Sequence, residues 1–328
     1  MKGTAGPASR ARRIAMVSFI IRRLAAGVLT VVTICVFGFF LLYLGAHDIA
    51  RRLVGSTASL EVVARKEVEL GLDRPLVSRF LEWAGGALSG DLGRSWFSGQ
   101  EVVDALMTRL PVTLSLTLGA TVLTAVVGVL VGVIAASKRG TADRVIQVVT
   151  VVVSSVPGFL IALFLVFAFG LTLHIFPATG YVPFGTSVTG WLSTVTLPVV
   201  ALALGAIASV AQQVRGSMID ALRLDYVRTL RSRGIPHGRV VYRHVLRNAA
   251  GPALSVLGIQ VIVMFGGAVV VEQVFSLPGV GQAAVGATLQ GDVPLVMGII
   301  VATAILVLAI NLVVDLLQGI LNPKVRVS

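Results

Sequence analysis

The side chains best suited to ionic contacts in this 328-residue sequence are arginines, gathered in one stretch of a largely apolar chain. Residues 215–250 contain Arg215, Arg223, Arg228, Arg231, Arg233, Arg239, Arg243 and Arg247. A single arginine at the centre of a bilayer costs about 2.5 to 3.5 kcal/mol on an insertion scale, so a cluster of them cannot be buried in lipid. This stretch is therefore predicted to face water.

The pattern around Gly234 predicts two short amphipathic helices that meet at a sharp turn. Before the turn, apolar residues recur at helical spacing, at Ile219, Leu222, Tyr226 and Leu230. Two acid–arginine pairs lie three residues apart there, Asp220 with Arg223 and Asp225 with Arg228. Glycine tolerates the left-handed conformation that ends a helix, and Pro236 readily starts the next one. After the turn, one face carries arginines and the opposite side is apolar, with Arg239, Arg243 and Arg247 against Val241 and Val245.

Two interpretations of this arginine hairpin (residues 215–250) follow from the pattern. A solvated loop needs neither an apolar stripe nor a glycine-proline corner, which favours a surface that presses onto another protein. The alternative is a topology signal lying on anionic lipid headgroups, which explains the charge but not the corner. The residues alone leave both interpretations open.

Motifs for catalysis are missing from the sequence. A P-loop requires Gly-Lys-Ser/Thr, and none of the four lysines follows a glycine, so ATP hydrolysis would belong to a partner. Neither H-E-x-x-H nor G-x-S-x-G occurs. The histidines fall in loops or at span ends and are interpreted as interfacial polar residues rather than catalytic or metal-binding groups: His47, His174, His237 and His244. Because Cys35 is the single cysteine, an intrachain disulfide and a thiol metal cluster are excluded. No catalytic, cofactor-binding or metal residue is predicted.

The elements that position the arginines should be membrane helices, because the composition is that of a membrane protein. Hydrophobic residues make up 56% of the chain, charged residues only 13%, and the mean hydropathy is +0.93. Abundant glycine and other small residues predict closely packed helices. A net charge of +12 would suggest nucleic acid in a soluble protein. In a membrane protein the position of the charge matters more than its sum, so membrane lipid and not nucleic acid is expected around this chain.

Six charge-free apolar runs are long enough to cross a hydrocarbon core roughly 30 Å thick as helices. They cover residues 24–46, 110–137, 145–173, 191–214, 252–271 and 293–314. The first run follows several arginines, as a secretory signal would. It is too long for a signal peptide and no A-x-A-like cleavage site follows it, so a retained span is predicted.

The distribution of basic residues orients these spans. Lys and Arg occupy the N-terminal tail (residues 1–23), the segment 138–144, the hairpin and the C-terminal tail (residues 321–328), whereas segments 174–190 and 272–292 contain none. The positive-inside rule therefore predicts cytoplasmic termini. Residues 47–109 mix both charges and carry turn signals near Gly71 and Gly90, which predicts a small external subdomain.

The segment after the fifth span is rich in turn residues and is predicted to lie outside. One interpretation is a gate or a docking surface for a substrate-delivering protein; the other is an ordinary structured loop. The residues concerned, in this loop and at the entry to the sixth span, are Glu272, Phe275, Pro278, Gly279, Gly281, Asp292 and Pro294.

Several of these segments, in this order, resemble the permease subunits of dipeptide and oligopeptide ABC importers. The hairpin with His244-Val245-Leu246-Arg247-Asn248 and Pro252 is similar to the cytoplasmic loop of that family. Further matching segments are 70–76, 90–95, 109–114, 272–281, 292–294 and 311–315. Two departures stand in the hairpin: Leu230 where importers in general have a small residue, and Arg228 where they have a glutamate, although the peptide branch commonly has arginine there. Asn322-Pro323-Lys324 also replaces a more usual Asp-Pro-Arg ending.

The resemblance implies an all-α integral membrane protein with the type I ABC importer permease fold, its core covering residues 110–320. It also implies a homologous second permease, two ATPase subunits that bind ATP and Mg, an extracytoplasmic solute-binding protein and a peptide substrate, in a bacterial inner membrane. In the family, the hairpin docks on an ATPase. The residues implied in that contact are Asp225, Tyr226, Arg228, Thr229, Arg231, Arg233, Gly234, Ile235, Arg239, His244, Arg247 and Asn248.

Two alternatives remain. An ion-coupled secondary transporter would place ionisable groups near the membrane centre, whereas Glu272 and Asp315 fall at predicted span ends. An importer of the same class could carry glutathione or a nickel chelate instead of a dipeptide or a longer peptide.

Overall fold

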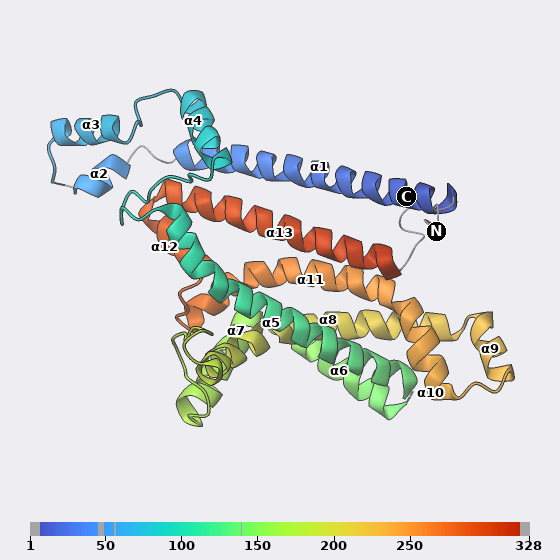
Figure 1. Cartoon of the computed structure of the whole chain (residues 1–328). Helices are drawn as coiled ribbons and strands as arrows, with labels where there is room; N and C mark the ends of the chain where they lie inside the picture. Colours follow the sequence, from blue (N-terminus) through green and yellow to red (C-terminus); the bar gives the residue numbers. More distant parts are fainter. Residues whose placement is uncertain (1–6, 45–48, 56, 139, 322–328) are drawn as a thin grey trace. The chain divides into compact units, whose positions relative to one another are not determined.

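The chain was analysed as a computed structural model that describes residues 7–44, 49–55, 57–138 and 140–321. Its regular structure there is helical, with one isolated bridge between Arg94 and Glu101. Five helices are long and apolar enough to cross a membrane, and a bent pair brings the number of spans to as many as six (Figure 1). The predicted basic tails fall largely outside the described part of the chain, which leaves out the side chains of residues 1–20 and all of residues 322–328.

The helices follow one another with short connections outside the external segment and the loop before α8. In chain order they are α1 (Pro7–Leu44), α2 (Ile49–Val54), α3 (Leu60–Glu69), α4 (Leu76–Leu88), α5 (Val102–Ser137), α6 (Thr141–Ser155), α7 (Gly158–Leu165), the π-helix η2 (Val166–Thr172), α8 (Val188–Leu222), α9 (Asp225–Ser232), α10 (His237–Arg239), the π-helix η3 (Val240–Val245), α11 (Leu246–Val274), α12 (Val280–Gln290) and α13 (Val293–Leu321).

The third predicted span, residues 145–173, differs from a single straight helix. It consists of α6 followed by α7 and η2, which meet at an angle of 95°. Val156 at the break is extended, with ψ at 124°, and Pro157 follows it. A proline disfavours the helical conformation of the residue before it, and its own fixed φ suits the start of the next helix. Val156-Pro157 therefore causes the bend, inside an otherwise continuous apolar run.

The chain folds into two compact units. The first comprises residues 1–23, 112–278 and 309–328, and the second comprises residues 24–111 and 279–308. The backbone passes from one unit to the other at Arg23–Leu24, Pro111–Val112, Pro278–Gly279 and Leu308–Ala309.

In the first unit, α8 packs against α6, α7 and α11 (Figure 1). Small residues permit close approach to α5 as well. A Cβ atom on Gly132 of α5 would lie 2.7 Å from the carbonyl oxygen of Ala211 and 2.7 Å from Cβ of Val214 on α8. One turn earlier, a Cβ atom on Gly128 would meet Val210 at 3.0 Å. The prediction of tight packing through small residues is confirmed at this crossing.

In the second unit, an aromatic cluster joins the end of α1 to the external helix α4. Phe39 is fully buried, and its ring lies 5.3 Å from Phe80 and 4.2 Å from Tyr43, centroid to centroid. The loop before α5 is held by Asp292, which accepts hydrogen bonds from the hydroxyl of Ser95 and from the backbone N–H of Trp96 at 3.1 Å. The predicted external subdomain thus has a helical structure, and its core is shared with the ends of α1 and α13 in the same unit.

Candidate functional site

The arginine hairpin consists of the end of α8, then α9, α10, η3 and the first turn of α11. Gly234 has φ at +74°, and Pro236 precedes α10, so the turn lies where the glycine-proline pair predicts it. Asp225 and Arg228 form an exposed ion pair at 3.7 Å. The pair predicted between Asp220 and Arg223 is not among the ion pairs of the described residues.

The apolar stripe of the hairpin is covered by the chain itself. Val227 of α9 and Val240, Val241 and Val245 of η3 are buried in a core with residues of α5, α8 and α11, and Ile219, Leu222, Tyr226, Leu230 and Ile235 pack against it. The surface that the stripe packs against therefore belongs to the chain's own helices, and the predicted contact of the hairpin with another protein remains a prediction. The hairpin is a rigid extension of the helices from which it projects.

The face left open by this packing is cationic. Seven arginines of the hairpin are exposed, together with Thr229 and Asn248: Arg223, Arg228, Arg231, Arg233, Arg239, Arg243 and Arg247. His244 is half-buried. A cavity of about 330 Å³ opens between the end of α5 and this face, lined by Ser137, Arg223, Arg228, Arg231 and His237. A partner that binds here must offer acidic or hydrogen-bond-accepting groups.

The base of the hairpin is fastened to α6 by a two-point ion pair. The Nε and Nη2 atoms of Arg215 donate to the two carboxylate oxygens of Asp143 at 2.6 and 2.7 Å. Both side chains are largely shielded, with exposed fractions of 27% for Arg215 and 18% for Asp143. Such a paired geometry fixes the orientation of the two helices as well as their distance.

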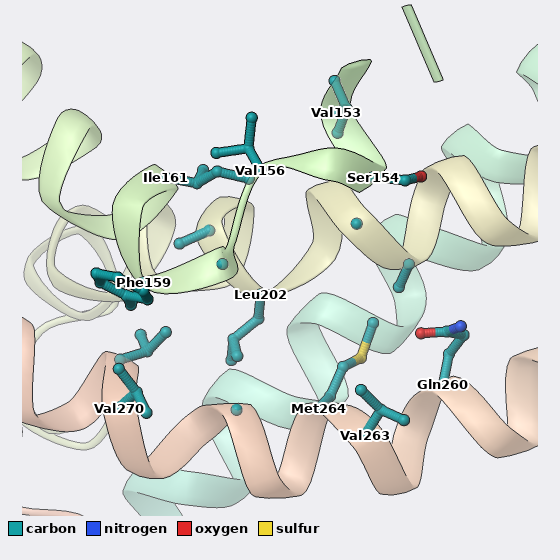
Figure 2. Close-up of a pocket in the computed structure, with 16 residues that line it drawn as sticks. Val153, Ser154, Val156, Phe159, Ile161, Leu202, Gln260, Val263, Met264 and Val270 are labelled. Atoms are coloured by element: carbon teal, nitrogen blue, oxygen red, sulfur yellow. The ribbon is translucent and has the colours of Figure 1, made fainter. Parts of the chain in front are cut away.

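A second feature of the first unit is an apolar cavity of about 380 Å³ in its membrane-spanning part (Figure 2). We call it the membrane cavity. Its walls come from the bend between α6 and α7, the middle of α8 and the middle of α11, and they include Ser154, Phe159, Gly205, Gln260, Met264 and Gly267. Ser154 and Gln260 are the polar side chains of its lining, so the cavity is suited to uncharged chemical groups.

The residues predicted as an external gate or docking surface are mostly buried. Glu272 is fully buried, and its carboxylate accepts a hydrogen bond from the hydroxyl of Thr113 at 2.6 Å. Phe275, Gly279, Gly281 and Asp292 are also buried, whereas Pro294 is half-buried and Pro278 is exposed. Buried residues of this kind stabilise the conformation of a loop. The predicted gating or docking role remains a prediction.

The acidic residues considered for ion coupling are both paired within the chain. Glu272 is bonded to Thr113 as described, and Asp315 lies 3.1 Å from the guanidinium of Arg23. Among the described residues, no group of three or more His, Cys, Asp or Glu side chains could hold a metal ion.

Sequence reasoning missed Gln260 because it searched the spans for ionisable side chains and catalytic motifs. The available signal was an uncharged amide in the middle of an apolar run, which is also costly in a membrane. The Gly128-x-x-x-Gly132 spacing on α5 was likewise a recognisable signal for close helix packing.

The family described as "Binding-protein-dependent transport system inner membrane component" matches residues 128–327, and its N-terminal companion family matches residues 16–117. A putative peptide transport system permease protein of Brucella abortus is 39% identical over 312 residues, covering 95% of this chain and 99% of the relative. The di/tripeptide transport system permease protein DppB of Pseudomonas aeruginosa is 35% identical, with the same coverage of both chains. The glutathione transport system permease protein GsiC of Shigella flexneri is 33% identical, again over 95% and 99%.

Among solved structures, an inward-facing MetNI methionine ABC transporter matches with a TM-score of 0.57 and 17% sequence identity, covering 67% of this chain and 97% of that chain. This similarity shows the fold, which is that of a type I ABC importer permease. With its long apolar helices, the chain is a multi-pass membrane protein and a transport subunit. It belongs to the family of inner-membrane components of binding-protein-dependent transport systems.

Proposed function

We propose that this chain is one of two permease subunits of an ATP-driven importer for di- or oligopeptides. The observation that carries the proposal is the identity of 35–39% with peptide transport permeases over 95% of the chain, which includes the arginine hairpin. The remaining subunits would be a homologous second permease, two ATPase subunits that bind ATP and Mg, and an extracytoplasmic solute-binding protein. The termini and the hairpin would lie in the cytoplasm.

The packing of the hairpin supports a mechanism for coupling. Its buried core joins α9 and η3 to α5, α8 and α11, so a push on the cationic face displaces these helices together. Two of them, α8 and α11, also line the membrane cavity. Closure of the ATPases on bound ATP would therefore be transmitted from the hairpin to the walls of the pathway by rigid helices. The bend between α6 and α7 forms the third wall of the cavity.

Uptake measurements test this proposal. The chain, with its partner subunits and binding protein, is reconstituted in vesicles and supplied with radiolabelled di- and tripeptides, with ATP inside or with a proton gradient alone. We expect uptake that requires ATP and is unaffected by the gradient. Uptake driven by the gradient without nucleotide would establish an ion-coupled carrier instead. Because a glutathione permease is among the relatives, labelled glutathione serves as a second substrate in the same vesicles.

A further inference from the structure

Gln260 is an amide in the middle of a membrane-spanning helix, and it has no hydrogen-bond partner among the residues that the structure describes. It lies halfway along α11 (Leu246–Val274) and is half-buried. Within the described part of the chain, neither its amide oxygen nor its amide nitrogen takes part in a hydrogen bond. Its neighbour Ile259 is an exposed apolar residue, at 60%, and Val263, which is 59% exposed, belongs to the wall of the membrane cavity.

An unpaired amide in this position is unfavourable unless something binds it. Transfer of an amide into an apolar environment without a compensating hydrogen bond costs free energy, and lipid tails offer no partner. Polar groups inside membrane spans therefore face a cavity or another polar group. Figure 2 shows the Gln260 side chain extending from the α11 backbone on the side of the membrane cavity, near Met264.

The chemistry of the cavity narrows the class of ligand. The Gln260 amide offers one acceptor and one donor group side by side, which is the complement of a peptide bond. The hydroxyl of Ser154, at the end of α6, is the other polar group of the lining, and it also lacks a partner among the described residues. No charged side chain lines the cavity, so it offers nothing to hold the charged ends of a peptide.

The cavity also has room on the α8 side. A Cβ atom on Gly205 would meet nothing within 4 Å, and a Cβ atom on Gly267 would touch only Leu202 at 3.4 Å. A volume of about 380 Å³ lies in the range of small-molecule sites. The space therefore fits a short stretch of peptide backbone with its amide against Gln260.

We propose that Gln260 is the residue of the translocation pathway that hydrogen-bonds a backbone amide of the transported peptide, with Ser154 as a weaker second contact. This inference rests on the proposed peptide importer and adds the position at which the peptide is recognised. A single amide in an apolar cavity recognises the peptide backbone and does not discriminate between the side chains of the cargo. Because one or two hydrogen bonds hold the peptide only weakly, the peptide can be released to the cytoplasm.

The test compares two peptides in the assembled, reconstituted transporter: trialanine and its analogue with the central amide nitrogen methylated. Gln260→Met removes the amide at similar length. We expect this variant to transport trialanine about five- to tenfold more slowly below saturation, the factor associated with one lost hydrogen bond. The preference of the wild type for trialanine over the methylated analogue should shrink in the variant. The binding protein contributes equally to both ratios, so the change reports on the permease.

Control variants separate this role from others. Ser154→Ala should reduce trialanine uptake slightly, whereas Ser255→Ala on α11, whose hydroxyl already donates to the carbonyl of Gly251 at 3.3 Å, should leave it unchanged. Gln260→Asn, which keeps a shorter amide, should restore part of the preference. Co-purification of all subunits should be the same for wild type and Gln260→Met, which would show that the variant still assembles.

Three outcomes would overturn the inference. Unchanged trialanine uptake and unchanged peptide preference in Gln260→Met would show that the amide does not contact cargo. Loss of the second permease from purified Gln260→Met complexes would show that the amide pairs across the subunit interface. If the wild type shows no ATP-dependent uptake of any peptide, the proposed function fails first, and this inference fails with it.

Discussion

The arginine hairpin and the membrane cavity belong to the same compact unit and share α8 and α11, yet their surfaces are opposite in chemistry. The hairpin exposes arginines over a buried apolar core, whereas the lining of the cavity carries no charge and only two polar side chains. A charged, rigid surface is suited to receive force from a specific partner. An apolar cavity with few polar groups is suited to let cargo pass. Under the proposed function, energy input and substrate passage would be separated along the same two helices.

The largest expected effect comes from reversing charge on the open face of the hairpin. The double variant Arg231→Glu with Arg239→Glu alters two exposed residues and leaves the buried core intact. It should abolish co-purification of the ATPase subunits and therefore all uptake, because the acidic surface of the partner would meet like charge. Arg65→Glu, the same change at an exposed arginine of α3, should leave assembly unchanged. Normal assembly of the double variant would refute the role of this face.

Filling the cavity should stop transport without affecting assembly. Gly205→Leu places a side chain where a Cβ atom meets nothing within 4 Å, so the helix should fold normally while the cavity is occupied. We expect near-complete loss of peptide uptake, with subunits that still co-purify. Gly132→Leu provides the contrast, because its Cβ atom would lie 2.7 Å from the backbone of α8 and the chain should fail to accumulate. Normal uptake by Gly205→Leu would place the cargo elsewhere.

Truncation within the core under the hairpin should lower stability moderately. Val227 is 1% exposed, and Val227→Ala leaves a small void, with an expected cost of about 1 to 3 kcal/mol. The thermal midpoint of the detergent-solubilised chain measures this loss. Leu224→Ala, at a neighbouring residue that is 48% exposed, should change the midpoint much less. Equal shifts for both variants would contradict the buried stripe.

The smallest expected effect concerns the two ion pairs of the hairpin. Asp143→Asn weakens the two-point contact with Arg215, and we expect a loss of about 1 kcal/mol, since both side chains are largely shielded. Asp225→Asn removes a partner that is 96% exposed and 3.7 Å from Arg228, so no measurable change in the thermal midpoint is expected. A larger effect at Asp225 than at Asp143 would reverse the ranking.

Much of this organisation was predictable from the sequence because it depends on strong local signals. The apolar runs, the arginine cluster and the Gly234-Ile235-Pro236 corner each depend on a cost or a preference that neighbours cannot easily override. The turn at Gly234 and the side of each helix that carries arginine are confirmed, whereas the second of the two predicted short helices is the start of one continuous helical segment from His237 to Val274. The fold class is confirmed by the match to the methionine transporter.

Other features of the structure could not be predicted in this way because they depend on contacts between residues far apart in the sequence. The stripe from Ile219 to Leu230 indicates that something covers it, but only the packing of α5, α8 and α11 shows that the chain covers it itself. The bend at Val156-Pro157 had a local signal that was hidden by uniform hydropathy. Glu272 is buried against Thr113, a residue far away in the sequence. The sequence around Glu272, at the end of a predicted span, therefore gave no sign that this side chain is buried.

The central claim, that force at the hairpin reaches the membrane cavity, can be tested by thiol labelling. Cys35 is the single cysteine, so Cys35→Ala with Val263→Cys gives one reporter at the cavity wall. In the assembled transporter, the account predicts a labelling rate that changes between nucleotide-free and ATP-bound states. Introducing the hairpin double variant should remove this change. The account would be contradicted if the labelling rate of the transporter with the wild-type hairpin were the same with and without ATP. It would also be contradicted if ATP changed the labelling rate equally in the hairpin double variant.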